Sequence, residues 1–244
     1  MTTIPTDLHG DTWDDVAAHR GLRRVLGIVG ALAATLAIAA SPWALDAPWL
    51  RFAFKPLATL CIIAWTVLRP ADGSETGARV KRWIVVGLVA SLAGDVALLW
   101  PQGFLVGLVS FLVGHVAYLV AFTRPVRFFG APLAFAAYAV VAGLILMRLW
   151  PGVPADLHLP VAVYVTALAA MAAQAASVAW RRRGQPDARR WMIAAVGGAL
   201  FVASDAILAV DKFGGGLALV SLLNLVPYWA GQWCLASAAG NGRR

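Results

Sequence analysis

Charged residues are scarce in this sequence of 244 residues: only 13% are Asp, Glu, Lys or Arg, and 61% are hydrophobic. A soluble domain carries about 25% charged residues, so the composition excludes an ordinary soluble domain and predicts a membrane protein. The two cysteines, Cys61 and Cys234, both lie in apolar runs, which favours small buried side chains over a disulfide or a metal site. The Gly-x-Ser-x-Gly motif of serine hydrolases is also absent.

Eight apolar stretches approach the length that crosses a bilayer, which takes roughly 20 mostly apolar residues. Proline and glycine mark most of their ends. They cover residues 22–40, 50–68, 83–100, 103–123, 128–150, 158–180, 190–211 and 215–238. We therefore predict an all-α, polytopic bundle of eight transmembrane helices over residues 21–244, preceded by an acidic extension over residues 1–20.

The formal net charge of +8 is explained by topology rather than by binding of nucleic acid. When the basic residues are assigned to alternate sides of the eight helices, 16 of the 20 fall on the side that holds both termini. Cytoplasmic loops carry the excess of Lys and Arg in membrane proteins. We therefore place both termini and the extension in the cytoplasm, and expect the bilayer rather than nucleic acid as the partner. The other side keeps Arg51, Lys55, Arg148 and Lys212.

Two ionisable residues lie within neighbouring apolar stretches. Asp95 precedes and His115 follows the predicted break between two helices at residues 100–103. A charged side chain at membrane depth costs about 2.5–3.5 kcal/mol on insertion scales, so such residues face the protein interior and are paired. Further polar residues at depth are Lys55, Tyr118, Tyr164, Gln174, Ser204, Asp205, Asn224, Tyr228 and Gln232.

Helix geometry predicts that part of this set forms one polar pocket. With a rise of about 1.5 Å per residue, Asp95, Asp205 and Lys55 lie in the outer half of the membrane, whereas His115 lies near its middle. Two carboxylates in a cavity of low dielectric suit acid–base catalysis, one as acid and the other as base. One histidine and two distant aspartates are a thin ligand set for zinc, so we predict no metal and no cofactor.

Two points stay open at this stage. Lys55 either neutralises Asp95 or Asp205 in a buried ion pair or binds a substrate phosphate, and His115 is either a packing residue or part of the site. The pattern Gly94-Asp95-x-x-Leu98 also recurs as Ser204-Asp205-x-x-Leu208, and Gly114-His115 as Gly231-Gln232. This favours a four-plus-four internal repeat, which in membrane proteins places the site between the halves.

Several short motifs, in order along the chain, resemble those of one family. They are Phe54-Lys55-Pro56-Leu57, Ser91-x-x-Gly94-Asp95, Phe111-x-x-Gly114-His115-x-x-Tyr118-x-x-x-Phe122, Gly198-Ala199-x-Phe201-x-x-Ser204-Asp205 and Tyr228-x-x-Gly231-Gln232. Together they resemble the YhhN/TMEM86 family of eight-helix membrane proteins, whose characterised members are lysoplasmalogenases. The resemblance implies a multi-pass protein of a bacterial cytoplasmic membrane that acts on a lysophospholipid.

The implied reaction is hydrolysis of the vinyl ether of an alkenyl lysophospholipid to a fatty aldehyde and a glycerophospho-alcohol. It needs an acid to protonate the enol-ether carbon and an anion to face the developing cation. We expect Asp95 and Asp205 to be the catalytic pair, in either order. The expected supporting or substrate-binding residues are Lys55, His115, Tyr118, Ser204, Tyr228 and Gln232.

A different class of function is compatible with the same residues. Intramembrane Asp and His side chains also form proton relays in transporters, so the alternative is a proton-coupled transporter of a small amphiphile that uses Asp95, His115 and Asp205. A purely structural role leaves the two aspartates unexplained.

Overall fold

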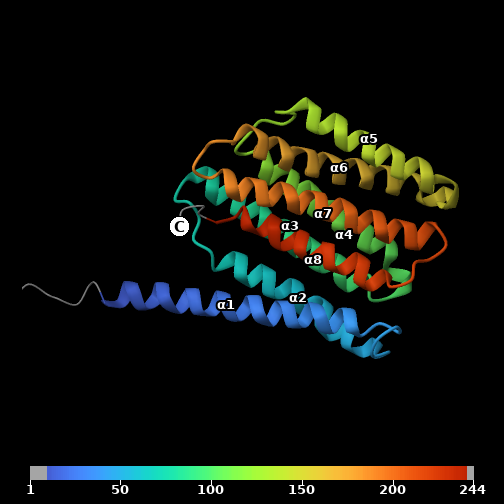
Figure 1. Cartoon of the computed structure of the whole chain (residues 1–244), viewed down its shortest axis with the longest axis horizontal. Helices are drawn as coiled ribbons and strands as arrows, with labels where there is room; N and C mark the ends of the chain where they lie inside the picture. The colour runs from blue at the N-terminus through green and yellow to red at the C-terminus, as the bar shows by residue number, and fades with distance from the viewer. Residues whose placement is uncertain (1–9, 241–244) are drawn as a thin grey trace, which may run out of the picture.

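Eight α-helices form the fold (Figure 1), and the structure, a computed structural model, describes residues 10–240, with side chains described from residue 18 onward. The helices are α1 (Gly10–Ala39), α2 (Pro48–Val67), α3 (Glu75–Ala97), α4 (Phe104–Phe122), α5 (Pro132–Leu149), α6 (His158–Arg181), α7 (Ala188–Phe213) and α8 (Val220–Ser237). Short 3₁₀ turns η1 (Pro101–Gly103), η2 (Trp150–Gly152) and η3 (Ala155–Leu157) lie between them. The prediction of an all-helical chain with eight long helices is confirmed for the described range.

Local sequence accounts for several helix boundaries. Pro48 and Pro132 occupy the first turns of α2 and α5. The backbone N–H groups in a first turn have no partner within the helix, so proline, which lacks this group, costs no hydrogen bond there. Ser74 caps α3, because its hydroxyl accepts a hydrogen bond from the backbone N–H of Gly77 at 2.9 Å. This helix therefore begins at Glu75, well before the apolar stretch that the sequence predicted over residues 83–100.

Six helices of the described chain are long and apolar enough to cross a membrane: α1, α2, α4, α5, α6 and α7. They make the chain a multi-pass membrane protein. The two remaining helices, α3 and α8, have both buried and exposed residues. α3 packs against α2, α4 and α8, and α8 packs most closely against α7. Figure 1 shows α1 and α2 at one edge of the bundle, α5 at the other, and the remaining helices between them.

Glycines let the central helices approach closely. A Cβ at Gly197 of α7 would lie 2.9 Å from the backbone oxygen of Gly231 in α8, so these two backbones are in contact there. On α3, Gly94 leaves the space that the ring of Phe111 fills from α4. In a bilayer the hydrophobic effect does not drive helices together, so they associate through van der Waals packing. Small residues allow this packing because they let the backbones approach closely. They also fix where the buried rings and polar groups of the core meet.

Candidate functional site

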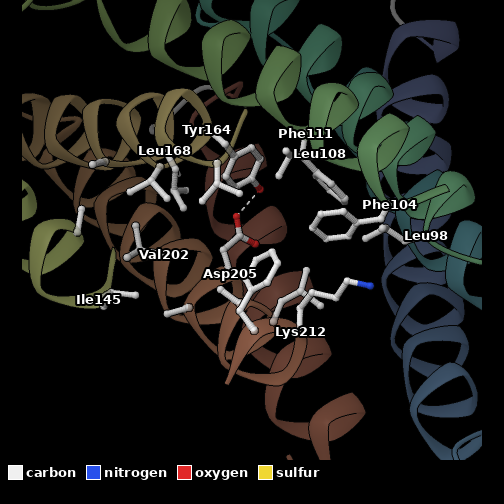
Figure 2. Close-up of a pocket in the computed structure, with 18 of the residues that line it drawn as sticks. Leu98, Phe104, Leu108, Phe111, Ile145, Tyr164, Leu168, Val202, Asp205 and Lys212 are labelled. Carbon is white, nitrogen blue, oxygen red and sulfur yellow. Dashed lines mark hydrogen bonds between the residues drawn. The ribbon is translucent and has the colours of Figure 1, made fainter. Parts of the chain in front are cut away.

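An apolar cavity of about 90 Å³ lies between α4, α5, α6 and α7 (Figure 2). Because a cavity needs roughly 10–15 Å³ to hold one water molecule, this one has room for about six to nine groups of that size. Its walls are mostly aliphatic and aromatic, and its polar side chains are Tyr138, Tyr164, Asp205 and Lys212. An apolar cavity with a few convergent polar groups is the typical form of a small-molecule site.

The carboxylate of Asp205 is the polar centre of this cavity. Tyr164 on α6 donates a hydrogen bond of 2.5 Å to Asp205 Oδ2, drawn as the dashed line in Figure 2. His115 on α4 lies beside them, with its Nε2 atom 3.0 Å from the Tyr164 oxygen and 3.5 Å from Asp205 Oδ2. No hydrogen bond from the described part of the chain reaches Asp205 Oδ1. One carboxylate oxygen is thus held by the protein and the other is free for a ligand.

The hydrogen bonds also assign the histidine tautomer. Tyr164 has a single hydroxyl proton and donates it to Asp205, so its oxygen can only accept from His115. His115 therefore carries a proton on Nε2, an assignment made from the network. The imidazole is fully buried, and no hydrogen bond from residues that the structure describes reaches its Nδ1 atom. The result is a directed chain from His115 through Tyr164 to Asp205.

Asp95 belongs to a second cluster, away from the cavity. Its side chain is 1% exposed, and its Oδ2 atom accepts hydrogen bonds from Thr59 at 2.6 Å and from Tyr228 at 2.7 Å. Lys55 forms an ion pair with Asp95 Oδ1 at 3.4 Å and donates to the Asp95 backbone oxygen at 3.2 Å. Lys55 was expected either to form a buried ion pair or to bind a substrate phosphate, and the structure shows the ion pair, with Asp95.

Two phenylalanines lie between the clusters. The Phe201 ring contacts the His115 ring at a centroid distance of 4.8 Å and the Tyr228 ring at 5.4 Å. Phe111 contacts Tyr228 at 5.8 Å and also lines the cavity. The expectation that both aspartates share one chamber is therefore not met, because only Asp205 is among the residues that line this cavity.

The other predicted site residues fall into three places. His115 joins the Asp205 cluster, as described above. Tyr118 and Gln232 extend the Asp95 cluster, because Tyr118 donates to Gln232 Oε1 at 2.6 Å and the Gln232 amide donates to Tyr228 at 3.2 Å. Ser204 instead joins α7 to α8, where its hydroxyl donates to the Asn224 backbone oxygen at 3.1 Å.

The sequence-based site omitted three of the four polar residues that line the cavity, namely Tyr138, Tyr164 and Lys212. Tyr164 is among the polar residues at depth, but nothing in its spacing links α6 to Asp205. Lys212 was assigned only to an outer loop, although it follows Asp205 on α7 by seven residues. Because seven residues make about two helical turns, this spacing places both side chains on one face. That signal was available in the sequence.

Metal binding has little support in the described residues. No group of three His, Cys, Asp or Glu side chains lies close enough together there to hold a metal ion. Within the Asp205 cluster, Asp205 and His115 are potential metal ligands, and Tyr164 is hydrogen-bonded between them. The arrangement is suited to general acid–base catalysis, in which a positioned side chain such as Asp transfers a proton to or from the reacting group.

Comparison with known proteins assigns the family. The model of the YhhN family matches residues 50–239, and the chain belongs to this family. It is 30% identical to human lysoplasmalogenase TMEM86B over 78% of this chain and 76% of that protein. It is 31% identical to a lysoplasmalogenase of Mycobacterium tuberculosis over 78% of this chain and 67% of the relative. No solved structure matches the chain significantly. The family and the enzyme class that the sequence motifs resemble are confirmed.

Proposed function

We propose that this protein is a lysoplasmalogenase-like hydrolase that cleaves the vinyl ether bond of alkenyl lysophospholipids and releases a fatty aldehyde and a glycerophospho-alcohol. The observation that supports it most directly is a carboxyl group, Asp205, in an apolar cavity of a membrane bundle, with one oxygen held by Tyr164 and the other free. The similarity to enzymes named lysoplasmalogenase supports the same assignment.

Proton transfer to carbon is the first step. Asp205 in its acid form donates a proton from Oδ1 to the enol-ether carbon that is not bonded to oxygen, and the adjacent carbon becomes an oxocarbenium ion. The hydrogen bond that Tyr164 donates to Oδ2 stabilises the carboxylate formed in this step. That carboxylate in turn faces the cation. A preorganised group that meets charge as it develops is a large source of catalysis.

Water then completes the hydrolysis. Asp205 takes a proton from a water molecule as its oxygen bonds to the cationic carbon, which gives a hemiacetal. The hemiacetal collapses when its hydroxyl proton is lost and the departing glycerol oxygen gains a proton, so the carboxyl group ends as it began. One carboxyl group therefore serves as acid and base in turn. The sequence-based scheme with two carboxylates needed both of them in the cavity.

For Asp95 we propose a positioning role. Its hydrogen bond holds Tyr228, whose ring packs against Phe111 at the cavity wall. Activity of Asp95→Asn tests this role against the earlier prediction of a catalytic one. We expect Asp95→Asn to keep more than 1% of the wild-type rate, whereas loss of the catalytic acid removes at least 99% of it.

We also propose that all eight helices span the bilayer, with both termini and residues 1–20 in the cytoplasm of a bacterial cell. The charge distribution supports this topology. Contacts of the two aspartates support the four-plus-four repeat. Asp95 on α3 bonds to α2 and α8, and Asp205 on α7 bonds to α6 and approaches α4. Each aspartate thus meets the preceding helix of its own half and the last helix of the other half.

Release of aldehyde by the purified protein tests the proposal. Detergent-solubilised protein is mixed with an alkenyl lysophospholipid and free aldehyde is measured, and Asp205→Asn is expected to lose at least 99% of the rate. The matched control is Asp211→Asn, on the same helix but outside the cavity lining. Full activity of Asp205→Asn refutes the mechanism. An intact lipid that moves across a sealed vesicle under a proton gradient instead supports the transporter alternative, which needs Asp95 in the same relay.

A further inference from the structure

Lys212 carries the one positive charge among the residues that line the cavity in the described chain. It lies near the outer end of α7, and its Nζ atom is 4.9 Å from the centroid of the Phe104 ring at the start of α4. A cation this close to an aromatic face is attracted by the ring. The ring therefore keeps the ammonium group at this end of the cavity, and Figure 2 shows both side chains there.

This ammonium group is available to a ligand, in contrast to that of Lys55. Lys55 is buried and paired with Asp95. No carboxylate of the described residues lies within ion-pair distance of Lys212, and its side chain is exposed. An unpaired cation beside an apolar cavity is suited to an anionic group at the end of an amphiphile.

The distance along α7 matches the proposed substrate. Asp205 and Lys212 are seven residues apart, so they lie on one face with a separation of about 10.5 Å along the helix axis. In an alkenyl lysophospholipid, seven bonds, one double and six single, separate the carbon that receives the proton from the phosphorus atom. An extended chain of seven such bonds spans roughly 8 Å. The reach of the lysine side chain and the contact distances at both ends account for the remainder.

We propose that Lys212 binds the phosphate of the lysolipid and thereby places the vinyl ether at Asp205. This inference rests on the function proposed above and names the group that selects the substrate. It transfers to Lys212 the phosphate-binding role that the sequence suggested for Lys55. In this arrangement the cavity holds the vinyl ether and the glycerol carbons, and the alkenyl chain lies along the aliphatic wall. Lys212 acts on binding and does not touch the reacting atoms.

Two substrates that differ only in the phosphate separate this role from a general one. Aldehyde release from an alkenyl lysophospholipid is compared with release from the corresponding 1-alkenylglycerol, for wild type, Lys212→Met, Lys212→Arg and Arg148→Met. Arg148 is an exposed cation at the end of α5, outside the cavity lining and on the same predicted side of the membrane, so its variant controls for charge at that surface. Thermal unfolding of each variant checks the fold.

Lys212→Met is expected to raise KM for the lysophospholipid about fivefold to tenfold, the scale of one net hydrogen bond at an exposed position, with kcat within about twofold. KM for the alkenylglycerol stays unchanged, Lys212→Arg restores most of the affinity, and Arg148→Met behaves as wild type. An equal change for both substrates, or no change for either, overturns the role of Lys212 while leaving the hydrolase intact. Wild-type protein that releases no aldehyde from either substrate overturns the proposed function and this inference together.

Discussion

Removal of the lysine from the buried pair on α2 and α3 is expected to destabilise the protein strongly. Asp95 is 1% exposed and Lys55 is 7% exposed, and their charged atoms are 3.4 Å apart. Loss of one partner from a buried ion pair leaves an uncompensated charge and costs about 3–5 kcal/mol. For a chain of this size, we expect Lys55→Met to lower Tm by roughly 10 °C.

Thermal unfolding of detergent-solubilised protein measures the effect, and Lys212→Met is the matched control. The control replaces the same residue type at an exposed position without a carboxylate partner, so its Tm should stay within about 1 °C of wild type. The variants Lys55→Met and Asp95→Asn, together with the double variant that carries both substitutions, form a double-mutant cycle.

Since neither variant residue then carries a charge, the double variant should be more stable than either single variant by several kcal/mol. Additive losses in the double variant would refute the ion-pair interpretation. A Tm for Lys55→Met equal to wild type, combined with a raised KM, would instead return the phosphate-binding role to Lys55.

Three further predictions concern the cavity, the contacts between helices and the loop between α2 and α3. Tyr164→Phe removes the donor to Asp205 and should lower kcat about 100-fold with little change in KM, measured by aldehyde release. Gly197→Ala places a methyl group about 2.8 Å from Cys234 Cβ and should cost about 1–3 kcal/mol, seen as a lower Tm. Burial alone would raise the pKa of Asp72, but hydrogen bonds from Ser74 and from Arg190 outweigh it and hold that pKa below 3.8. A lowered pKa in the folded state stabilises the protein above about pH 3.8 and loses this effect as the pH falls further, so Asp72→Asn should lower Tm at pH 6 and flatten its decline in acid.

The helices of this fold could be predicted from the sequence because their signals are local. Apolar runs bounded by proline and glycine gave the positions of all eight, and the expected buried pairing of charge proved to be between Lys55 and Asp95. The largest boundary errors were at the starts of α1 and α3, which begin at Gly10 and Glu75 rather than near residues 22 and 83. In both helices, polar and charged residues before the apolar run are also helical.

The grouping of polar residues could not be predicted in the same way. His115 and Tyr118 are three residues apart on α4 and were expected on one side of a single pocket. They point about 60° apart around the helix, since each residue turns by about 100°. This difference directs His115 to Tyr164 on α6 and Tyr118 to Gln232 on α8. Which helix lies at each angle depends on packing between distant segments, and no local pattern encodes it.

Incorporation of deuterium from the solvent into the aldehyde tests most directly whether Asp205 protonates the vinyl ether inside the cavity. The purified enzyme is allowed to react in D₂O, and the aldehyde is trapped at early times and analysed by mass spectrometry. We expect one deuterium on the carbon next to the aldehyde group, a slower reaction than in H₂O, and at most 1% of the wild-type rate from Asp205→Asn. Aldehyde that lacks deuterium, or labelled aldehyde formed by Asp205→Asn at the wild-type rate, would contradict it.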